Sequence, residues 1–397
     1  MIPYAGFLYF GLVAYVAVPG LVLGVLRARG ARWWTAAATA IMLSIQYNVW
    51  LRTGPHPQTW VREVWLLVGY AIVQWLVAAA LLETLKELDR PSPTATWLAV
   101  TLALAPLVVA KFEPLFNPKY PWGFLGVSYL TFRSLDTIIG INDRLITKMP
   151  PVQYLAYLLF FPTISSGPID RYRRFSQDWE RRRTRAEVLT DVDGAVHRIF
   201  TGFLYKFILA YLIKRYWMDP VAGRYYGLLA DVSYMYAYSL YLFFDFAGYS
   251  AFAIGVGYLF GIHTPENFDR PFLARNIRDF WNRWHISLSW WFRDHVYMRF
   301  VMAATRRRWF KSKYTASYLG FVLSMGLMGV WHGVAAHFIL YGLYHASLII
   351  GFDFLSRWNK ARPKPLWGEG PLWRAAGTFL TFQAVCFGLL LFSGRLG

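Results

Sequence analysis

The sequence predicts an all-α polytopic membrane protein, and three observations support this fold class. Of the 397 residues, 56% are hydrophobic and only 16% are charged, whereas soluble proteins average about 25% charged residues. Apolar runs of roughly 20 residues, long enough to cross a bilayer as a helix, recur along the chain. Lysine and arginine gather in the short loops between these runs, which is the pattern of cytoplasmic loops. We therefore expect one integral-membrane domain at residues 1–397.

Ten apolar runs are expected to cross the membrane as helices. Five belong to the first part of the chain, at residues 4–26, 33–50, 62–82, 95–110 and 123–141. Five more follow, at residues 196–217, 228–260, 316–331, 337–355 and 374–392. No charged residue precedes the first run, so we expect it to stay as a span and not to be cleaved as a signal peptide.

The apolar run at residues 152–168 departs from this pattern. Lys148 precedes it and Arg171 follows it, so both of its ends look cytoplasmic. It also contains Pro162 and Pro168, which interrupt a helix. We expect a re-entrant hairpin here, because a broken helix at membrane depth is tolerated only where protein shields its backbone.

Residues 278–293, with the sequence RDFWNRWHISLSWWFR, are expected to form a helix within an amphipathic segment at residues 276–300. On one continuous helix, five polar side chains share a face: Arg278, Asn282, His285, Ser289 and Arg293. A polar seam centred on a histidine is costly to keep in or near lipid, and it often marks a substrate path. The alternative is an interfacial helix whose arginines reach the headgroups and whose histidine serves packing alone.

His332, in the sequence MGVWHG near the end of an apolar run, is a candidate general base. A buried neutral imidazole can accept a proton in acyl transfer when its pKa lies near the working pH. The alternative is a histidine that is hydrogen-bonded between helices. Asp245, within FFDFAGYS, must be paired, protonated or facing water. Arg133 and Asp136, three residues apart, are expected to form an intrahelical ion pair.

Several kinds of chemistry have no support in the sequence. His337 and His345 lack carboxylate or cysteine partners at ligand spacing, so no metal site is expected. The chain has neither a glycine-rich phosphate loop nor a nucleophile elbow, so a covalent serine mechanism is not expected. The formal charge of +19 is spread through short loops, so nucleic acid is not an expected partner.

Seven blocks, taken in order, resemble the membrane-bound O-acyltransferase family and, within it, the DltB branch of D-alanyl transfer proteins. The blocks are FLGVSYLTFR at 124–133, FFPTISSGPIDR at 160–171, GFLYKF at 202–207, LFFDFAGYS at 242–250, ENFDRPF at 266–272, residues 279–299 and MGVWHG at 328–333. They cover about residues 112–344, whereas the first hundred residues match only in hydropathy. The resemblance implies a ring of about 10–11 transmembrane helices with re-entrant and interfacial helices. Spans at 1–111 and 346–397 would flank an acyltransferase core at 112–345.

The resemblance also implies a reaction and its residues. His332 and His285 match the two signature histidines and are the expected catalytic residues. We expect four further side chains to line the substrate tunnel or to support the oxyanion: Asn282, Ser289, Trp331 and Asp245. The acyl donor would be D-alanine held as a thioester on the phosphopantetheine of a DltC-like acyl carrier protein, and the chain itself would bind no cofactor. The acceptor would be a hydroxyl of a cell-envelope polymer such as teichoic acid.

The same resemblance implies partners in the bacterial plasma membrane. These are a DltD-like protein, a DltX-like small peptide, membrane lipid and the carrier protein. The carrier would contact a set of basic residues: Arg171, Arg173, Arg174, Arg306 and Arg307. Their alternative role is to set topology and to attract anionic lipids.

Two other functions stay open on the sequence. The first is an O-acetyltransferase of an exopolysaccharide or peptidoglycan, whose relatives usually carry a proline-leucine-glycine-glycine run where this chain has Met298–Arg–Phe–Val301 after Tyr297. The second is a transporter with polar residues along a midplane pathway, although no pair of corresponding broken helices supports it.

Overall fold

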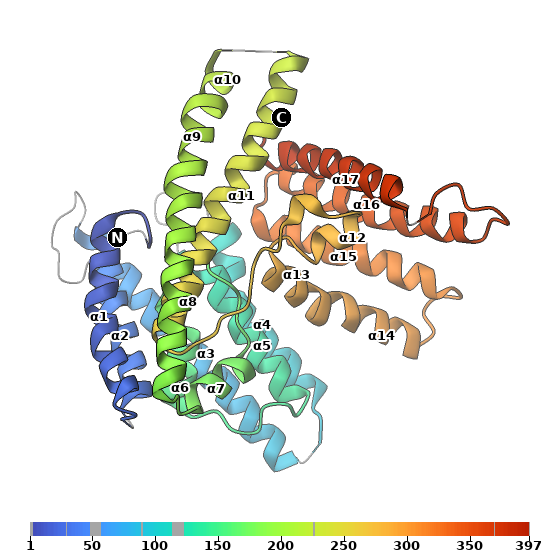
Figure 1. The fold of residues 1–397 in the computed structure, drawn as a ribbon. Helices are drawn as coiled ribbons and strands as arrows, with labels where there is room; N and C mark the ends of the chain where they lie inside the picture. Colours follow the sequence, from blue (N-terminus) through green and yellow to red (C-terminus); the bar gives the residue numbers. More distant parts are fainter. Residues whose placement is uncertain are drawn as a thin grey trace. The chain divides into compact units, whose positions relative to one another are not determined.

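The computed structural model describes residues 3–28, 30–47, 57–88, 90–112, 123–224, 227–368 and 370–396 (Figure 1). Within these ranges the regular elements are helices, and the β contact is a single bridge between Phe268 and Trp284. The chain divides into two compact units. Unit 1 comprises Met1–Gly202 and Tyr249–Pro265, and unit 2 comprises Phe203–Gly248 and Glu266–Gly397.

Seven helices in the described ranges are long and apolar enough to cross a membrane, which confirms the polytopic all-α prediction. They cover Phe7–Val25, Arg62–Leu88, Pro93–Phe112, Arg185–Gly223, Leu228–Leu259, Ala336–Lys360 and Pro371–Phe392. The other three expected spans are also helical, as α2 (Ala31–Gln46), α5 (Val127–Asn142) and α15 (Lys313–His332). Residues 48–50 of the second expected span lie outside the described residues.

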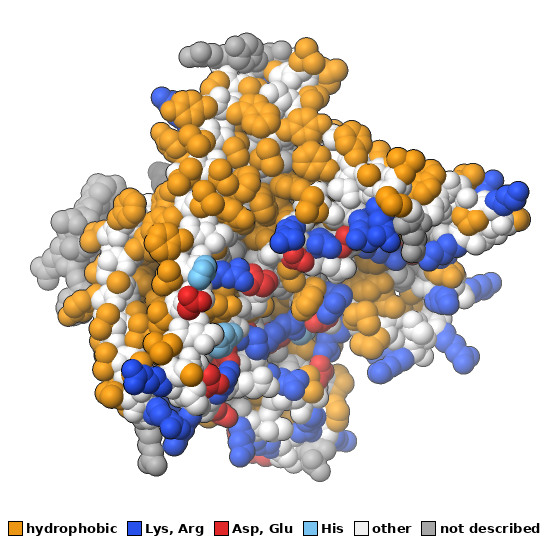
Figure 2. Space-filling model, in the orientation of Figure 1, with side chains coloured by type: hydrophobic (Ala, Val, Ile, Leu, Met, Phe, Trp, Pro, Cys, Tyr) orange, Lys and Arg blue, Asp and Glu red, His pale blue; other side chains and the backbone are white. Residues whose placement is uncertain are grey.

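Outward-facing apolar side chains cover the long helices. From α8 (Arg185–Phe203) the chain stays helical through η3 (Leu204–Ala210), α9 (Tyr211–Ile213), η4 (Lys214–Met218) and α10 (Asp219–Arg224), of which η3 and η4 are π-helical. Figure 2 shows hydrophobic side chains over this helix and over α11 (Leu228–Leu259) at the top of the view. Such a surface is unfavourable in water and suits contact with lipid.

Unit 1 is built around α5, which is buried along most of its length. The other elements of this unit include α1 (Phe7–Val25), α2, α3 (Pro57–Leu88), α4 (Pro93–Phe112), α6 (Pro151–Leu158), η2 (Phe161–Thr163), α7 (Tyr172–Glu180) and most of α8. The eight-residue helix α6 is about 12 Å long and cannot cross an apolar layer of about 30 Å. The polypeptide turns at η2 and returns as irregular chain to α7.

Arg133 of α5 stabilises this turn, and the expected pair between Arg133 and Asp136 is not formed. The fully buried guanidinium donates to the carbonyl oxygens of Leu158 at 2.9 Å and Thr163 at 2.7 Å. Asp136 instead accepts from Arg171 at 2.9 Å. The prediction was wrong because the end of α6 leaves carbonyl oxygens without helical partners, and a guanidinium has five donors to satisfy them.

Unit 2 contains η5 (Pro271–Leu273), α12 (Ile277–Trp281), α13 (Ile286–Phe292), η6 (Arg293–Tyr297) and α14 (Met298–Arg306). These precede the pair α15 and α16 (Ala336–Lys360), which is followed by α17 (Pro371–Phe392). Gly342 of α16 lies directly against the backbone of Met325 and Gly329 in α15. The two helices therefore pack backbone to backbone, as small residues permit inside a membrane.

Candidate active site

A break in the predicted helix at residues 278–293 positions His285. The chain leaves α12 at Trp281 and begins α13 only at Ile286, so the prediction of one continuous helix was wrong. His285 lies at the break in the left-handed conformation, with φ of 42°. The five polar residues expected on one face therefore do not share a helix face.

A second backbone segment holds this break in place. The amide of Ile286 donates to the carbonyl of Asn267 at 2.9 Å, and the amide of Asp269 donates to the carbonyl of Arg283 at 3.0 Å. The Ser287 hydroxyl donates to the side-chain oxygen of Asn267 at 2.6 Å. A continuous helix would use these groups internally, so pairing with residues 267–269 requires the helix to open here.

His285 is buried, and its Nε2 atom has no hydrogen-bond partner in the described structure. The ring of Phe246 meets it edge to face, with centroids 4.8 Å apart. A left-handed backbone at a non-glycine residue costs roughly 1–2 kcal/mol. The strain and the unpaired nitrogen together are typical of a functional position rather than of a packing residue.

His332 is the last residue of α15, and it is half-buried. Phe392 meets its ring edge to face at 4.8 Å, and Trp331 lies beside it at 4.5 Å. The imidazole therefore lies among aromatic rings at the end of the span.

Both histidines line one cavity of about 130 Å³ within unit 2. Its other lining residues are Leu242, Phe246, Trp281, Trp284, Leu288, Met328, Tyr341, Leu389 and Phe392. Ligand sites for drug-sized molecules usually have about 300–1,000 Å³, so this cavity suits a group of only a few heavy atoms. Two imidazoles, one phenol and two indoles are its side chains with polar atoms, and the other six lining side chains are apolar.

Tyr341 of α16 is the residue of this cavity that sequence reasoning missed. It lies 6.3 Å from His332 between ring centroids, and its hydroxyl forms no hydrogen bond with the described residues. Its ring is buried against His345, whose two ring nitrogens also lack partners. An aromatic residue in an apolar run has the same pattern as a packing residue, and only its place eight residues after the MGVWHG block hinted at the site.

The other predicted tunnel residues do not line this cavity. Asn282 is exposed at the end of α12, and the Ser289 hydroxyl donates to the carbonyl of Trp284 at 3.0 Å. Trp331 adjoins His332 without reaching the cavity wall. Asp245 pairs with Lys206. Their roles in a tunnel stay predictions.

The predicted carrier-contact residues differ in how accessible they are. In unit 1, Arg171 pairs with Asp136, Arg174 pairs with Asp170 and Asp178, and Arg173 is exposed. In unit 2, Arg306 and Arg307 are exposed at the end of α14. Because ion pairs within the chain already neutralise Arg171 and Arg174, the exposed residues are better placed to meet an acidic partner. Among the described residues, no three His, Cys, Asp or Glu side chains gather as a metal-binding group would.

Comparison with known proteins places this site in a family. The family described as MBOAT, membrane-bound O-acyltransferase, matches residues 30–390. The chain is 40% identical to the teichoic acid D-alanyltransferase of Bacillus subtilis (strain 168), over 100% of this chain and 98% of the relative. It is 38% identical to the protein of the same name from Lacticaseibacillus rhamnosus, over 99% and 97% of the two chains. A probable alginate O-acetylase of Pseudomonas syringae is 28% identical, over 79% of this chain and 57% of the relative.

These matches extend the resemblance beyond the seven blocks. None of the seven blocks lies in the first hundred residues, which resemble the family only in hydropathy. The alignments with the two D-alanyltransferases include these residues as well. The described helices, the apolar spans and the family match agree on a multi-pass membrane acyltransferase. The chain belongs to the membrane-bound O-acyltransferase family.

Proposed function

We propose that the protein transfers D-alanine from the phosphopantetheine thioester of a DltC-like carrier protein to a hydroxyl of teichoic acid in the bacterial plasma membrane. The observation that carries the proposal is that His285 and His332, from distant parts of the sequence, line one small cavity. The D-alanyltransferases that align with the whole chain at 38–40% identity support the choice of acyl group and acceptor.

The cavity suits the reacting end of this donor. A volume of about 130 Å³ holds a short acyl group but not a fatty acyl chain. D-alanine carries an ammonium group, and five aromatic rings line the cavity: Phe246, Trp281, Trp284, Tyr341 and Phe392. Aromatic faces attract ammonium ions by roughly 0.5–2 kcal/mol, so this wall favours an alanyl over an acetyl group.

His332 is the proposed general base. It takes the proton of the acceptor hydroxyl while the oxygen attacks the thioester carbonyl carbon. The carbon–sulfur bond of the tetrahedral intermediate then breaks, and the proton passes from the imidazolium to the departing thiolate. The products are an ester and a free thiol, and a thioester is reactive enough for this exchange without a covalent enzyme intermediate.

His285 and Tyr341 are the proposed oxyanion donors. An imidazole N–H and a phenol O–H that face a water-poor cavity can stabilise the developing negative charge of the intermediate. Fixing both substrates in one narrow site adds to the rate, because effective molarities in well-oriented systems reach about 10⁵ M or more. The DltD-like protein and the DltX-like peptide are proposed partners that receive or guide the alanyl group.

Thioester discharge tests this function directly. Purified protein in lipid would be mixed with carrier loaded with labelled D-alanine or labelled acetate, and with teichoic acid as acceptor. We expect rapid discharge of D-alanine by the wild type and slow discharge by His332→Gln. His197→Gln is the matched control, because that side chain is exposed and lies in unit 1.

Other outcomes would redirect the proposal. Discharge of acetate alone would move the protein to the O-acetyltransferases. If neither label moves although carrier and acceptor are competent, the transferase proposal fails and a transport function gains support.

A further inference from the structure

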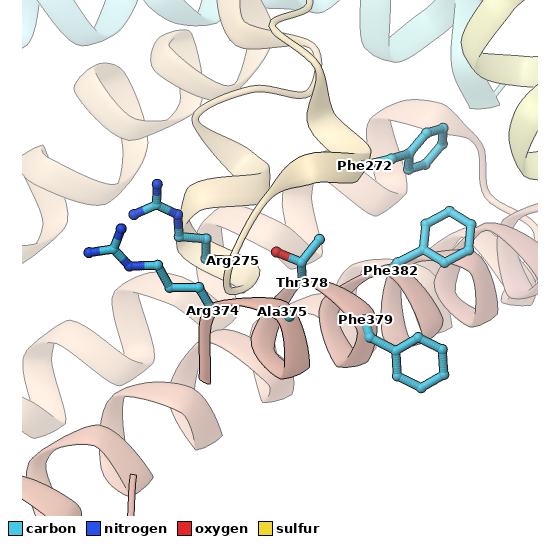
Figure 3. Close-up of a pocket in the computed structure, with 7 residues that line it drawn as sticks. All are labelled: Phe272, Arg275, Arg374, Ala375, Thr378, Phe379 and Phe382. Carbon is cyan, nitrogen blue, oxygen red and sulfur yellow. The ribbon is translucent and has the colours of Figure 1, made fainter. Parts of the chain in front are cut away.

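An open pocket of about 530 Å³ in unit 2 lies apart from the histidine cavity and shares no lining residue with it. Its walls are the loop around η5 and the N-terminal half of α17 (Figure 3). Seven residues line it: Phe272, Arg275, Arg374, Ala375, Thr378, Phe379 and Phe382. The set divides into a cationic end and an aromatic end, with Ala375 and Thr378 between them.

The cationic end concentrates positive charge. Figure 3 shows the side chains of Arg275 and Arg374 extending side by side in the same direction. No carboxylate belongs to the lining. Asp279, which accepts from the backbone amide of Arg275 at 3.0 Å, is already paired with Arg283 at 2.8 Å. Arg374 also lies in the first turn of α17, where the helix dipole is positive, so the place favours an anion.

Close backbone packing fixes the spacing of the two arginines. A methyl group on Gly377 of α17 would come within 2.6 Å of the carbonyl oxygen of Arg275. Only glycine lets the loop lie this close to the helix, one turn away from Arg374. The backbone positions that carry Arg275 and Arg374 are therefore held at a fixed spacing, so both side chains start from one preformed framework.

The aromatic end belongs to a membrane-spanning helix. Phe379 is 63% exposed on α17, and Phe382 meets Phe272 edge to face at 5.4 Å. Because α17 is one of the seven apolar spans and Arg374 is in its first turn, the pocket runs from the end of the span into the span itself. This order of groups complements an amphiphile with a charged head and an apolar tail.

We propose that this pocket binds the phosphate headgroup of an anionic membrane lipid. Arg275 and Arg374 hold the phosphate oxygens by charge-assisted hydrogen bonds, and the acyl chain lies along Phe379 and Phe382. The site is distinct from acyl transfer and requires no chemical step. A free phosphate would use the same arginines but would gain nothing from the phenylalanines.

Lipid binding by the full-length protein in detergent tests the proposal. Phosphatidylglycerol and phosphatidylcholine would be titrated, with bound lipid counted by native mass spectrometry and stability followed by thermal unfolding. We expect Arg275→Gln with Arg374→Gln to weaken phosphatidylglycerol binding about tenfold, since charge-assisted hydrogen bonds are lost. Arg362→Gln is the matched control, because Arg362 is an exposed arginine stacked on Trp358 outside the pocket.

A second variant separates the two sources of phosphate. Phe379→Asn keeps both arginines, and we expect it to weaken phosphatidylglycerol binding while leaving the fold intact. Stabilisation of the wild type by millimolar inorganic phosphate to the same extent as by the lipid would overturn the lipid assignment. Equal binding of phosphatidylglycerol by the double variant, the Arg362 control and the wild type would overturn the site itself.

Discussion

His345 lies against the backbone of Gly388, so close that a methyl group on Gly388 would come within 2.5 Å of the ring atom Nε2. The imidazole is fully buried and meets Tyr341 at 4.6 Å and Trp281 at 5.1 Å between ring centroids. Tyr341 and Trp281 line the histidine cavity on their other sides. The close contact between Gly388 and His345 therefore helps to hold Tyr341 and Trp281, two residues of the cavity wall, in position.

Gly388→Ala should push His345 toward the cavity. Overpacking of a filled core typically costs about 1–3 kcal/mol, and the rings of Tyr341 and Trp281 would have to move with the imidazole. We expect a lower thermal midpoint and slower thioester discharge, both measured on the purified protein. Gly351→Ala is the matched control on the neighbouring helix α16, because a methyl group there meets no atom within 4 Å. Normal discharge by Gly388→Ala would mean that the wall tolerates this displacement.

Tyr341→Phe removes one hydroxyl and keeps the ring. If that hydroxyl donates to the oxyanion, its loss should slow discharge by about 10²–10³-fold, as for other oxyanion donors. Because the hydroxyl forms no hydrogen bond with the described residues, the thermal midpoint should stay close to that of the wild type. Single-turnover rates and thermal unfolding would be measured on the same preparation. A wild-type rate would restrict Tyr341 to packing.

His285 can be separated into its backbone role and its imidazole role. Asparagine adopts the left-handed conformation readily, whereas a β-branched residue does not. We expect His285→Asn to fold normally but to lose most activity, and His285→Val to lose stability as well, by roughly 1–2 kcal/mol. Thermal unfolding and discharge assays distinguish the two variants. Equal stability of both would show that the φ of 42° at this position is not a constraint.

Stability should fall with rising pH because of His263 in unit 1. Hydrogen bonds with Asp178 and then Asp191 raise the pKa of His263 from 6.5 to about 9. The charged imidazole thus stabilises the folded state fully below pH 6.5, and this contribution is lost as the pH rises to about 9. Arg174 pairs with Asp178, and Arg183 pairs with Asp191, so each of these carboxylates also faces a guanidinium group.

The thermal midpoint measured across this pH window tests the assignment. His263→Gln should flatten the decline, whereas His197→Gln, which changes an exposed histidine, should leave it as steep as in the wild type. An unchanged slope in His263→Gln would assign the pH dependence to another group.

The sequence predicted the helices better than it predicted the site. Hydropathy runs locate the spans because the bilayer demands an apolar surface and internally paired backbone over a fixed length. His332 is visible for the same reason, since a histidine at the end of such a run stands out. The spacing of polar and apolar residues could not reveal the break in the helix at His285. The break depends on a hydrogen bond to the backbone of Asn267, which lies some twenty residues earlier in the sequence.

Arg133 shows the same limit in unit 1. The i, i+3 rule suggested a pair with Asp136, yet the carbonyl oxygens of Leu158 and Thr163 compete successfully for the guanidinium. These carbonyl oxygens are available to accept only because α6 ends at Leu158, and the spacing of Arg133 and Asp136 gives no information about that helix end. Tyr341 was missed because an aromatic side chain in an apolar run has the same appearance whether it packs or catalyses.

In the proposed reaction, the small size of the histidine cavity would limit which acyl groups a carrier protein can deliver. Carrier thioesters of very different length share one phosphopantetheine arm, so the arm itself offers nothing to discriminate between them. A space of about 130 Å³ would exclude long acyl chains before any bond is made or broken. Fidelity for chain length would then be a property of the wall residues rather than of the catalytic pair, and enlarging Met328 or Leu389 to phenylalanine should narrow the accepted range further.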